Sequence, residues 1–247
     1  MKARLLKWCT AGVALFCLPV LAEELLVGFG PHRPPYVFEN EPQGLEYELF
    51  VAAASASGFD VKAHYGPTPR LALMFNQQKL SAMSSMFLSG QLHGHFTEPY
   101  VTYQDMAVAL AKRNLEIKTV ADLERYSVSS FKDARRLLGD EFATMVQRNP
   151  AYREEPRQIN RNLLLYGERI DVVVGDPLII QFFNPHIAKQ VDTRQPLRWY
   201  PLFQPINFQA VFHTKQQRDR FNAGLAAIRS NGLYQRIEQR YRSASLN

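Results

Sequence analysis

Strand patterns alternate with helix patterns along this chain, and this alternation limits its fold more than any other feature of the sequence. In the first third, short apolar or alternating runs at 25–30, 59–65 and 80–86 have the pattern of strands. Between them, residues 45–58 and 70–78 place apolar side chains at helical spacing. Because a helix separates each strand from the next, we expect parallel strands joined by right-handed crossovers.

The rest of the chain continues the same pattern. Strands are predicted at 105–112, 126–130, 170–175 and 208–213, a helix start at 119–124, and helices at 132–147, 160–166 and 177–183. Two further helices follow, with a break near Asn231 and Gly232. The sequence therefore predicts a doubly wound α/β protein, whose ligands bind at the carboxyl ends of the strands.

The N-terminal segment has the pattern of a cleavable signal peptide. Three basic residues precede an apolar run at 8–21, and the run ends at the small residue Ala22. The run is shorter than the ~20 apolar residues that a membrane span needs, so a membrane anchor is the weaker interpretation. We expect a signal peptide at 1–22 and a mature protein in the periplasm.

The cysteines and the charge exclude several classes of protein. Both cysteines, Cys9 and Cys17, lie in the predicted signal peptide, so the mature chain would have no disulfide, thiol nucleophile or Cys-ligated metal. Without the three basic residues of that segment, 26 basic residues stand against 23 acidic ones. The sequence has no dense basic patch, and this argues against nucleic-acid binding.

Signs of catalysis and of cofactors are weak. The chain has no G-x-S-x-G, H-E-x-x-H or P-loop motif. His93 and His95 are close in sequence, but a zinc site needs three or four ligands. We therefore predict no metal, no cofactor and no catalytic residue.

Six stretches of the sequence resemble a known family. They are PPYVF at 34–38, GLEYEL at 44–49, residues 73–82, FTEPY at 96–100, LYGERIDVVVGD at 165–176, and residues 222–241. The chain resembles the extracellular solute-binding proteins of family 3, the substrate-binding proteins of polar amino-acid ABC transporters. The resemblance covers the whole mature chain.

The resemblance implies an α/β fold of the type II periplasmic binding class, with two lobes. Each lobe would be a mostly parallel sheet flanked by helices. Lobe 1 would comprise residues 24–108 together with 206–247, and lobe 2 residues 109–205. Two crossovers, near Val108 and Pro205, would form the hinge.

One departure from the family pattern concerns the ligand. The family has an arginine just before "F-S-x-P-Y" that holds the ligand's carboxylate, whereas residues 87–95 contain none. Arg70, which opens the preceding helix, is a candidate substitute. Glu46 and Tyr47 match a position near the cleft, but acidic residues are also favoured in the first turn of a helix.

The resemblance also implies a set of ligand-binding residues. Tyr36 would lie over the ligand, and Asp176 would receive a ligand ammonium, although an Asp before Pro is also a common helix N-cap. The predicted strand ends add further candidates, because Ser84 and Ser85 in lobe 1 end one strand and Ser129 and Ser130 in lobe 2 end another just before a helix, where they would offer hydroxyls and N–H groups. The alternative for these serines is turn chemistry alone.

These features lead to a functional prediction. We expect a monomeric periplasmic protein that captures a small polar ligand, amino-acid-like or amine-bearing, for the permease of an ABC importer. One alternative is a ligand-sensing protein that acts on the periplasmic domain of a membrane sensor. Another is an enzyme similar to cyclohexadienyl dehydratases, with Glu98, His95 or Asp176 as general acid. Such an enzyme would need a group that holds the carboxylate of its substrate, so the absence of the family's arginine from residues 87–95 argues against this alternative.

Overall fold

The computed structural model describes residues 22–86 and 92–244, without the side chains of Ser85, Met86 and Ala244. The predicted signal peptide at 1–22 therefore lies, apart from Ala22, outside the described residues. No helix within the described ranges combines the length and the apolar character that crossing a membrane requires.

The first sheet begins with three parallel strands. They are β1 (Glu23–Phe29), β2 (Phe59–Tyr65) and β3 (Ala82–Met86), and β1 lies in the middle with Val27 opposite both Ala63 and Ala82. β11 (Ile206–Phe212) runs antiparallel to β3 and also pairs with β4 (His95–Phe96) and β5 (Val101–Tyr103). The helices of this lobe, which we call lobe 1, are α1 (Leu45–Ala56), α2 (Thr68–Asn76), α7 (Lys215–Ser230) and α8 (Leu233–Ala244).

The second sheet has the order β10-β6-β9-β7-β8. Its strands are β6 (Met106–Leu110), β7 (Val128–Ser130), β8 (Tyr152–Glu154), β9 (Val172–Gly175) and β10 (Leu197–Tyr200). Its helices are α3 (Ala134–Leu137), α4 (Asp140–Arg148), α5 (Gln158–Tyr166) and α6 (Pro177–Ile187), with 3-10 turns η1 (Ala111–Arg113) and η2 (Ala121–Arg125). We call this part lobe 2.

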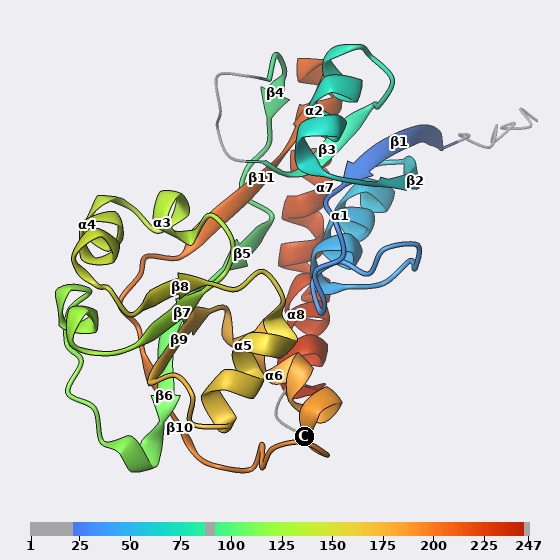
Figure 1. The fold of residues 1–247 in the computed structure, drawn as a ribbon. Coiled ribbons are helices and arrows are strands. Elements are labelled where there is room, and N and C mark those ends of the chain that lie inside the picture. The colour runs from blue at the N-terminus through green and yellow to red at the C-terminus, as the bar shows by residue number, and fades with distance from the viewer. Residues whose placement is uncertain (1–21, 87–91, 245–247) are drawn as a thin grey trace, which may run out of the picture.

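The two-lobed α/β architecture is confirmed, and Figure 1 shows the lobes on either side of the crossing segments β5–β6 and β10–β11. Within each lobe the sheet is mixed. β8, β7 and β9 are parallel in lobe 2, while β6 and β10 run antiparallel to their neighbours. The chain leaves lobe 1 after β5 and returns at β11, whereas the limits 24–108 with 206–247 and 109–205 stay a prediction.

Each sheet buries apolar side chains against its helices. In lobe 1, Phe50 of α1 packs with Phe212 of β11 and Phe221 of α7. α1 and α7 approach closely because α7 has a glycine at 224, where a Cβ atom would lie 2.0 Å from the carbonyl oxygen of Ala53. In lobe 2, Val172 and Val174 face one side of the sheet and Val173 faces the other.

Two features of the secondary structure differ from the sequence prediction. The helix predicted over 132–147 is divided into α3 and α4, because Gly139 adopts a left-handed φ of 90°. The short strands β4, β5, β8 and β10 have no counterpart in the prediction. β4 and β5 pair with β11, which lies far away in sequence, so no local pattern marks them.

Candidate functional site

The loop at 31–44 brings Tyr36 to the junction of the two lobes. The N–H groups of Leu45 and Glu46 donate to the carbonyl oxygens of Pro35 (2.9 Å) and Tyr36 (3.0 Å), so the loop caps the N-terminus of α1. This packing requires the glycine at 44, whose φ is 120° and whose Cβ would lie 2.2 Å from the Tyr36 carbonyl oxygen. The Tyr36 side chain is thereby held almost fully buried.

Asp176 reaches the same junction from lobe 2. Its Oδ1 accepts hydrogen bonds from the N–H groups of Leu178 (2.9 Å) and Ile179 (3.3 Å), so Asp176 is the N-cap of α6. Its Oδ2 accepts from the Tyr36 hydroxyl (2.9 Å) and from the Gln104 N–H (3.0 Å). One carboxylate thus connects lobe 1, the crossing segment and lobe 2. Burial raises the pKa of Asp176, and these hydrogen bonds oppose that rise.

Glu46 organises the lobe 1 side of the junction. This carboxylate is fully buried and accepts from the hydroxyls of Ser84 and Tyr103, both at 2.8 Å, and from Nη2 of Arg33 at 3.1 Å. The Tyr103 ring stacks on Tyr36 with 3.8 Å between centroids, and the Arg33 guanidinium lies 4.7 Å from the Tyr103 ring centre. Of the two interpretations of Glu46, the structure therefore favours a place beside the junction.

Three buried side-chain atoms have no hydrogen-bond partner among the described residues, namely Nε of Arg33, Nε of Arg161 and the hydroxyl of Ser129. The carboxylate of Asp105, a residue that is 8% exposed, also accepts no hydrogen bond from residues 22–86 and 92–244. Such groups are costly unless they are hydrogen-bonded, and most buried polar groups in proteins are.

The electrostatics of the junction centre on Asp105, which is 8% exposed. Burial, together with the charge of Asp176, raises the pKa of Asp105 to about 7, although the charges of Arg161 and Arg33 act in the opposite direction. Burial also lowers the pKa of Arg161 to about 10, against the charges of Glu155 and Asp105. Unlike Asp176 and Glu46, which accept several hydrogen bonds from the protein, Asp105 and Arg161 therefore lie where burial disfavours their charged forms.

The structure brings three of the predicted site residues together, namely Tyr36, Ser84 and Asp176. Ser130 is buried in lobe 2 with its hydroxyl 2.6 Å from that of Tyr152. Arg70 lies exposed on α2 and has no side-chain partner in the described ranges. The Ser85 side chain lies outside the described residues.

Sequence reasoning missed Arg33, Tyr103, Asp105 and Arg161. Arg33 rather than Arg70 supplies the guanidinium that lobe 1 places at the junction. Only Asp105 carried a usable signal, because it is an acidic residue in the segment that crosses between the lobes. Arg161 lies on a helix, where a charged residue is normally expected on the surface.

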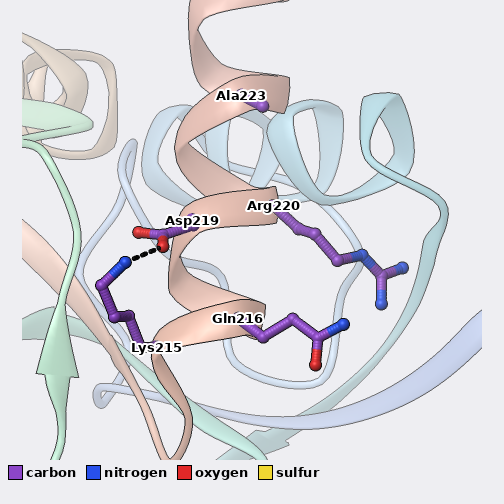
Figure 2. A pocket seen from close by; sticks show the side chains of 5 residues that line it. All are labelled: Lys215, Gln216, Asp219, Arg220 and Ala223. Carbon is purple, nitrogen blue, oxygen red and sulfur yellow. Dashed lines mark hydrogen bonds and ion pairs between the residues drawn. The ribbon is translucent and has the colours of Figure 1, made fainter.

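A surface depression on α7 is unrelated to this junction. Figure 2 shows its lining residues, Lys215, Gln216, Asp219, Arg220 and Ala223, all from one helix. Lys215 pairs with Asp219 at 2.7 Å, and Arg220 pairs with Glu23. Because the charges are already paired and only one element contributes, we do not place ligand binding there. Across 22–86 and 92–244, no three His, Asp or Glu side chains group closely enough to hold a metal ion.

The sequence pattern of the bacterial extracellular solute-binding proteins, family 3, matches residues 25–244. The chain belongs to this family. Proteins of family 3 mainly bind small solutes, and the position of the junction between two lobes agrees with that activity. Among curated proteins, no sequence match was found.

Solved structures share the fold of this family 3 chain at low sequence identity. A histidine kinase sensor domain similar to periplasmic binding proteins has a TM-score of 0.66 and 17% identity, covering 90% of this chain and 96% of that one. The amino acid ABC transporter substrate-binding protein AbpA from Streptococcus pneumoniae, bound to L-arginine, has a TM-score of 0.64 and 16% identity, covering 91% and 96%. The GluR0 ligand-binding core with L-glutamate has 0.67 and 16%, covering 89% and 98%.

Proposed function

We propose that this chain is a periplasmic solute-binding protein that captures a small polar ligand, amino-acid-like or amine-bearing, between its lobes for the permease of an ABC importer. The observation that carries the proposal is the set of unpartnered polar groups around the junction. Nε of Arg33 comes from lobe 1 and Nε of Arg161 from lobe 2, and Asp105, whose carboxylate is acted on by both charges, lies in the segment between the lobes. A small polar ligand would supply the partners that these groups lack.

The contacts between the lobes suggest how ligand binding would favour one arrangement of the two lobes. The Tyr36 hydroxyl meets Asp176 across the junction, and the Phe38 ring of lobe 1 lies 5.6 Å from the Phe182 ring of lobe 2. A ligand that contacts both lobes stabilises the arrangement in which they touch, because only that arrangement makes both sets of contacts. The permease would recognise this arrangement, and no covalent chemistry is required.

A binding screen tests the proposal. The exported protein, purified from the periplasm, is melted with each of the amino acids, polyamines, organic acids and small peptides in turn. A ligand present at 100 times its dissociation constant should add about 2.7 kcal/mol of stability. A dose-dependent rise in melting temperature with 1:1 binding by calorimetry supports solute capture, and no response across the panel argues against it. Sequencing the N-terminus of the same preparation should give Glu23 if residues 1–22 are a cleaved signal peptide.

A sensor role is the second candidate. It is favoured by the similarity of this fold to that of a histidine kinase sensor domain. Uptake of the radiolabelled ligand by a strain that lacks the gene separates the two roles. Lost uptake indicates an importer, whereas normal uptake with an altered transcriptional response to the ligand indicates a sensor. Recovery of unchanged ligand after prolonged incubation would agree with binding without catalysis, whereas turnover of a cyclohexadienyl acid would show a dehydratase.

A further inference from the structure

The hydrogen bond between Tyr36 and Asp176 joins two side chains that each lobe holds in place separately. In lobe 1, the Tyr36 ring stacks on Tyr103 with 3.8 Å between centroids, and the Tyr103 hydroxyl donates to Glu46 at 2.8 Å. In lobe 2, Asp176 is fixed as the cap of α6, where it accepts from the N–H of Leu178 at 2.9 Å. Because neither side chain has to be ordered when the lobes meet, little conformational entropy opposes the bond.

The chemistry of the two groups also favours the bond. The Tyr36 hydroxyl donates to Oδ2 of Asp176 at 2.9 Å, and the two residues are only 1% and 4% exposed. Burial, together with the charge of Asp176, raises the pKa of Tyr36 well above its usual range, so the proton stays on the hydroxyl at neutral pH. A buried carboxylate that loses such a donor is left without a partner for that acceptor position, which is costly. Separation of the lobes should therefore be opposed by this single contact.

The same bond takes up an acceptor position on the carboxylate that is predicted to receive a ligand ammonium. A carboxylate offers about four acceptor positions on its two oxygens. In Asp176, the N–H groups of Leu178 and Ile179 donate to Oδ1, while the Gln104 N–H and the Tyr36 hydroxyl donate to Oδ2. Of these four donors, only the Tyr36 hydroxyl comes from lobe 1. A solute group that binds Oδ2 would therefore compete with Tyr36.

We propose that Tyr36 and Asp176 form an internal latch, which holds the two lobes together without a solute and which must open before a solute can bind Asp176. Only the population with an open latch would be competent to bind, so the apparent dissociation constant of a solute would exceed its intrinsic value. This part in solute capture rests on the proposed function. The closure of the lobes by the latch does not, because it can be measured with no solute present.

The distance between the lobes tests the latch directly. Both cysteines of the chain lie within residues 1–22, so the exported protein should offer no native thiol to a label. Spin labels are attached to Gln77→Cys, at the end of α2, and to Thr144→Cys, on α4; both positions are exposed, and the two helices lie in different lobes (Figure 1). Any bound solute is removed by unfolding in guanidinium chloride, dialysis and refolding. Pulsed electron paramagnetic resonance then gives the distribution of distances between the labels.

Two substitutions of tyrosine by phenylalanine form a matched pair. Tyr36→Phe removes the hydroxyl of the latch, whereas Tyr166→Phe removes a buried hydroxyl that accepts from Asn184 within lobe 2. Each is also combined with Phe182→Ala, which removes a ring contact between the lobes and brings the separated form into the measurable range. We expect a single short distance in the wild type. The ratio of closed to separated protein should fall at least about tenfold with Tyr36→Phe and change less than about twofold with Tyr166→Phe.

Each other outcome contradicts a stated part of the proposal. If Tyr36→Phe leaves the distances unchanged with and without Phe182→Ala, other contacts hold the lobes and the latch is wrong. The latch is also wrong if the solute-free wild type already has separated lobes, or if Tyr166→Phe separates them as far as Tyr36→Phe does. Solute capture is judged by the binding screen alone: if no solute binds while Tyr36→Phe still separates the lobes, the latch closes the protein but has no part in capture.

Discussion

Replacing Asp105 by asparagine should change how the stability of this protein depends on pH. In the folded chain, burial and the charge of Asp176 raise the pKa of Asp105 from 3.8 to about 7. A group with a raised folded-state pKa contributes stability that is fully present below its unfolded pKa and is lost as the pH rises through its folded pKa. The window for Asp105 therefore runs from about pH 4 to about pH 7.

The size of the effect follows from the same two values. A rise of about three pKa units corresponds to about 4 kcal/mol, since each unit is worth about 1.36 kcal/mol. Part of this is already lost at pH 5, so about 2.5 kcal/mol should be lost between pH 5 and pH 8. For a chain of this size, this corresponds to roughly 5–10 °C in melting temperature. Asparagine cannot ionise, so Asp105→Asn should lack this loss and gain stability relative to the wild type as the pH rises.

Urea and thermal denaturation of the wild type and the variant at pH 5, 6, 7 and 8 measure this difference. Subtracting the free energy of unfolding of the variant from that of the wild type at each pH removes the contribution of every other titrating group that the substitution leaves unchanged. Asp171→Asn is the matched control. Burial works to raise the pKa of Asp171, but hydrogen bonds from Ser127 and the Arg113 charge lower it, so its stabilisation is lost only as the pH falls below about 4. Parallel curves for the wild type and Asp105→Asn from pH 5 to 8 would refute the reasoning, because they would mean that the Asp105 carboxylate is already paired or solvated.

Three further tests, two of them with a matched second substitution, address the packing of the two lobes. Tyr36→Phe removes the hydroxyl that bonds across the lobes but keeps the stacked ring, and should lower the free energy of unfolding by about 1.5–3 kcal/mol in urea; an unchanged midpoint would show that the bond adds nothing. Gly44→Ala places a methyl group 2.2 Å from a carbonyl oxygen at a φ of 120°, and should lower the free energy of unfolding by at least about 1–3 kcal/mol in thermal denaturation. Gly30→Ala should lower it less, because a Cβ atom there meets nothing within 4 Å. Equal losses for the two variants would contradict the packing described for Gly44. Ser129→Ala removes a buried hydroxyl that has no partner among the described residues, and should leave the melting temperature unchanged or raise it. Ser130→Ala breaks the hydrogen bond with Tyr152 and should lower the free energy of unfolding by about 1 kcal/mol. A larger loss of stability for Ser129→Ala than for Ser130→Ala would mean that the Ser129 hydroxyl has a hydrogen-bond partner.

The fold was predictable where local pattern and local chemistry agree. β2 begins and ends as the alternating run 59–65 predicts, and Gly58 ends the preceding helix with a left-handed φ of 82°. The prediction failed where one residue outweighs periodicity, as when Gly139 divides a predicted helix into α3 and α4. It also failed for strands such as β4 and β5, which exist because β11 returns beside them from a distant part of the sequence.

The candidate site was predictable only in part, for a similar reason. Tyr36 and Asp176 occupy positions that family motifs mark, so a single sequence was enough to point to them. Arg33, Asp105 and Arg161 lie in a loop, a crossing segment and a helix, where charged residues are normally solvated. Asp105 and Arg161 are nevertheless buried in the folded chain, and no local pattern of the sequence indicates this burial.

The packing of the first turn of α6 affects how ligand binding should depend on temperature. Leu178 follows the Asp176 cap and is 6% exposed, and it is buried in the apolar cluster of lobe 1 although its helix belongs to lobe 2. Separating the lobes would therefore bring hydrocarbon surface into contact with water as well as breaking polar contacts. Ligand binding that draws the lobes together should accordingly have a negative heat-capacity change. The apolar share of the binding energy would then weaken on cooling, so calorimetry at two temperatures can separate it from the polar share.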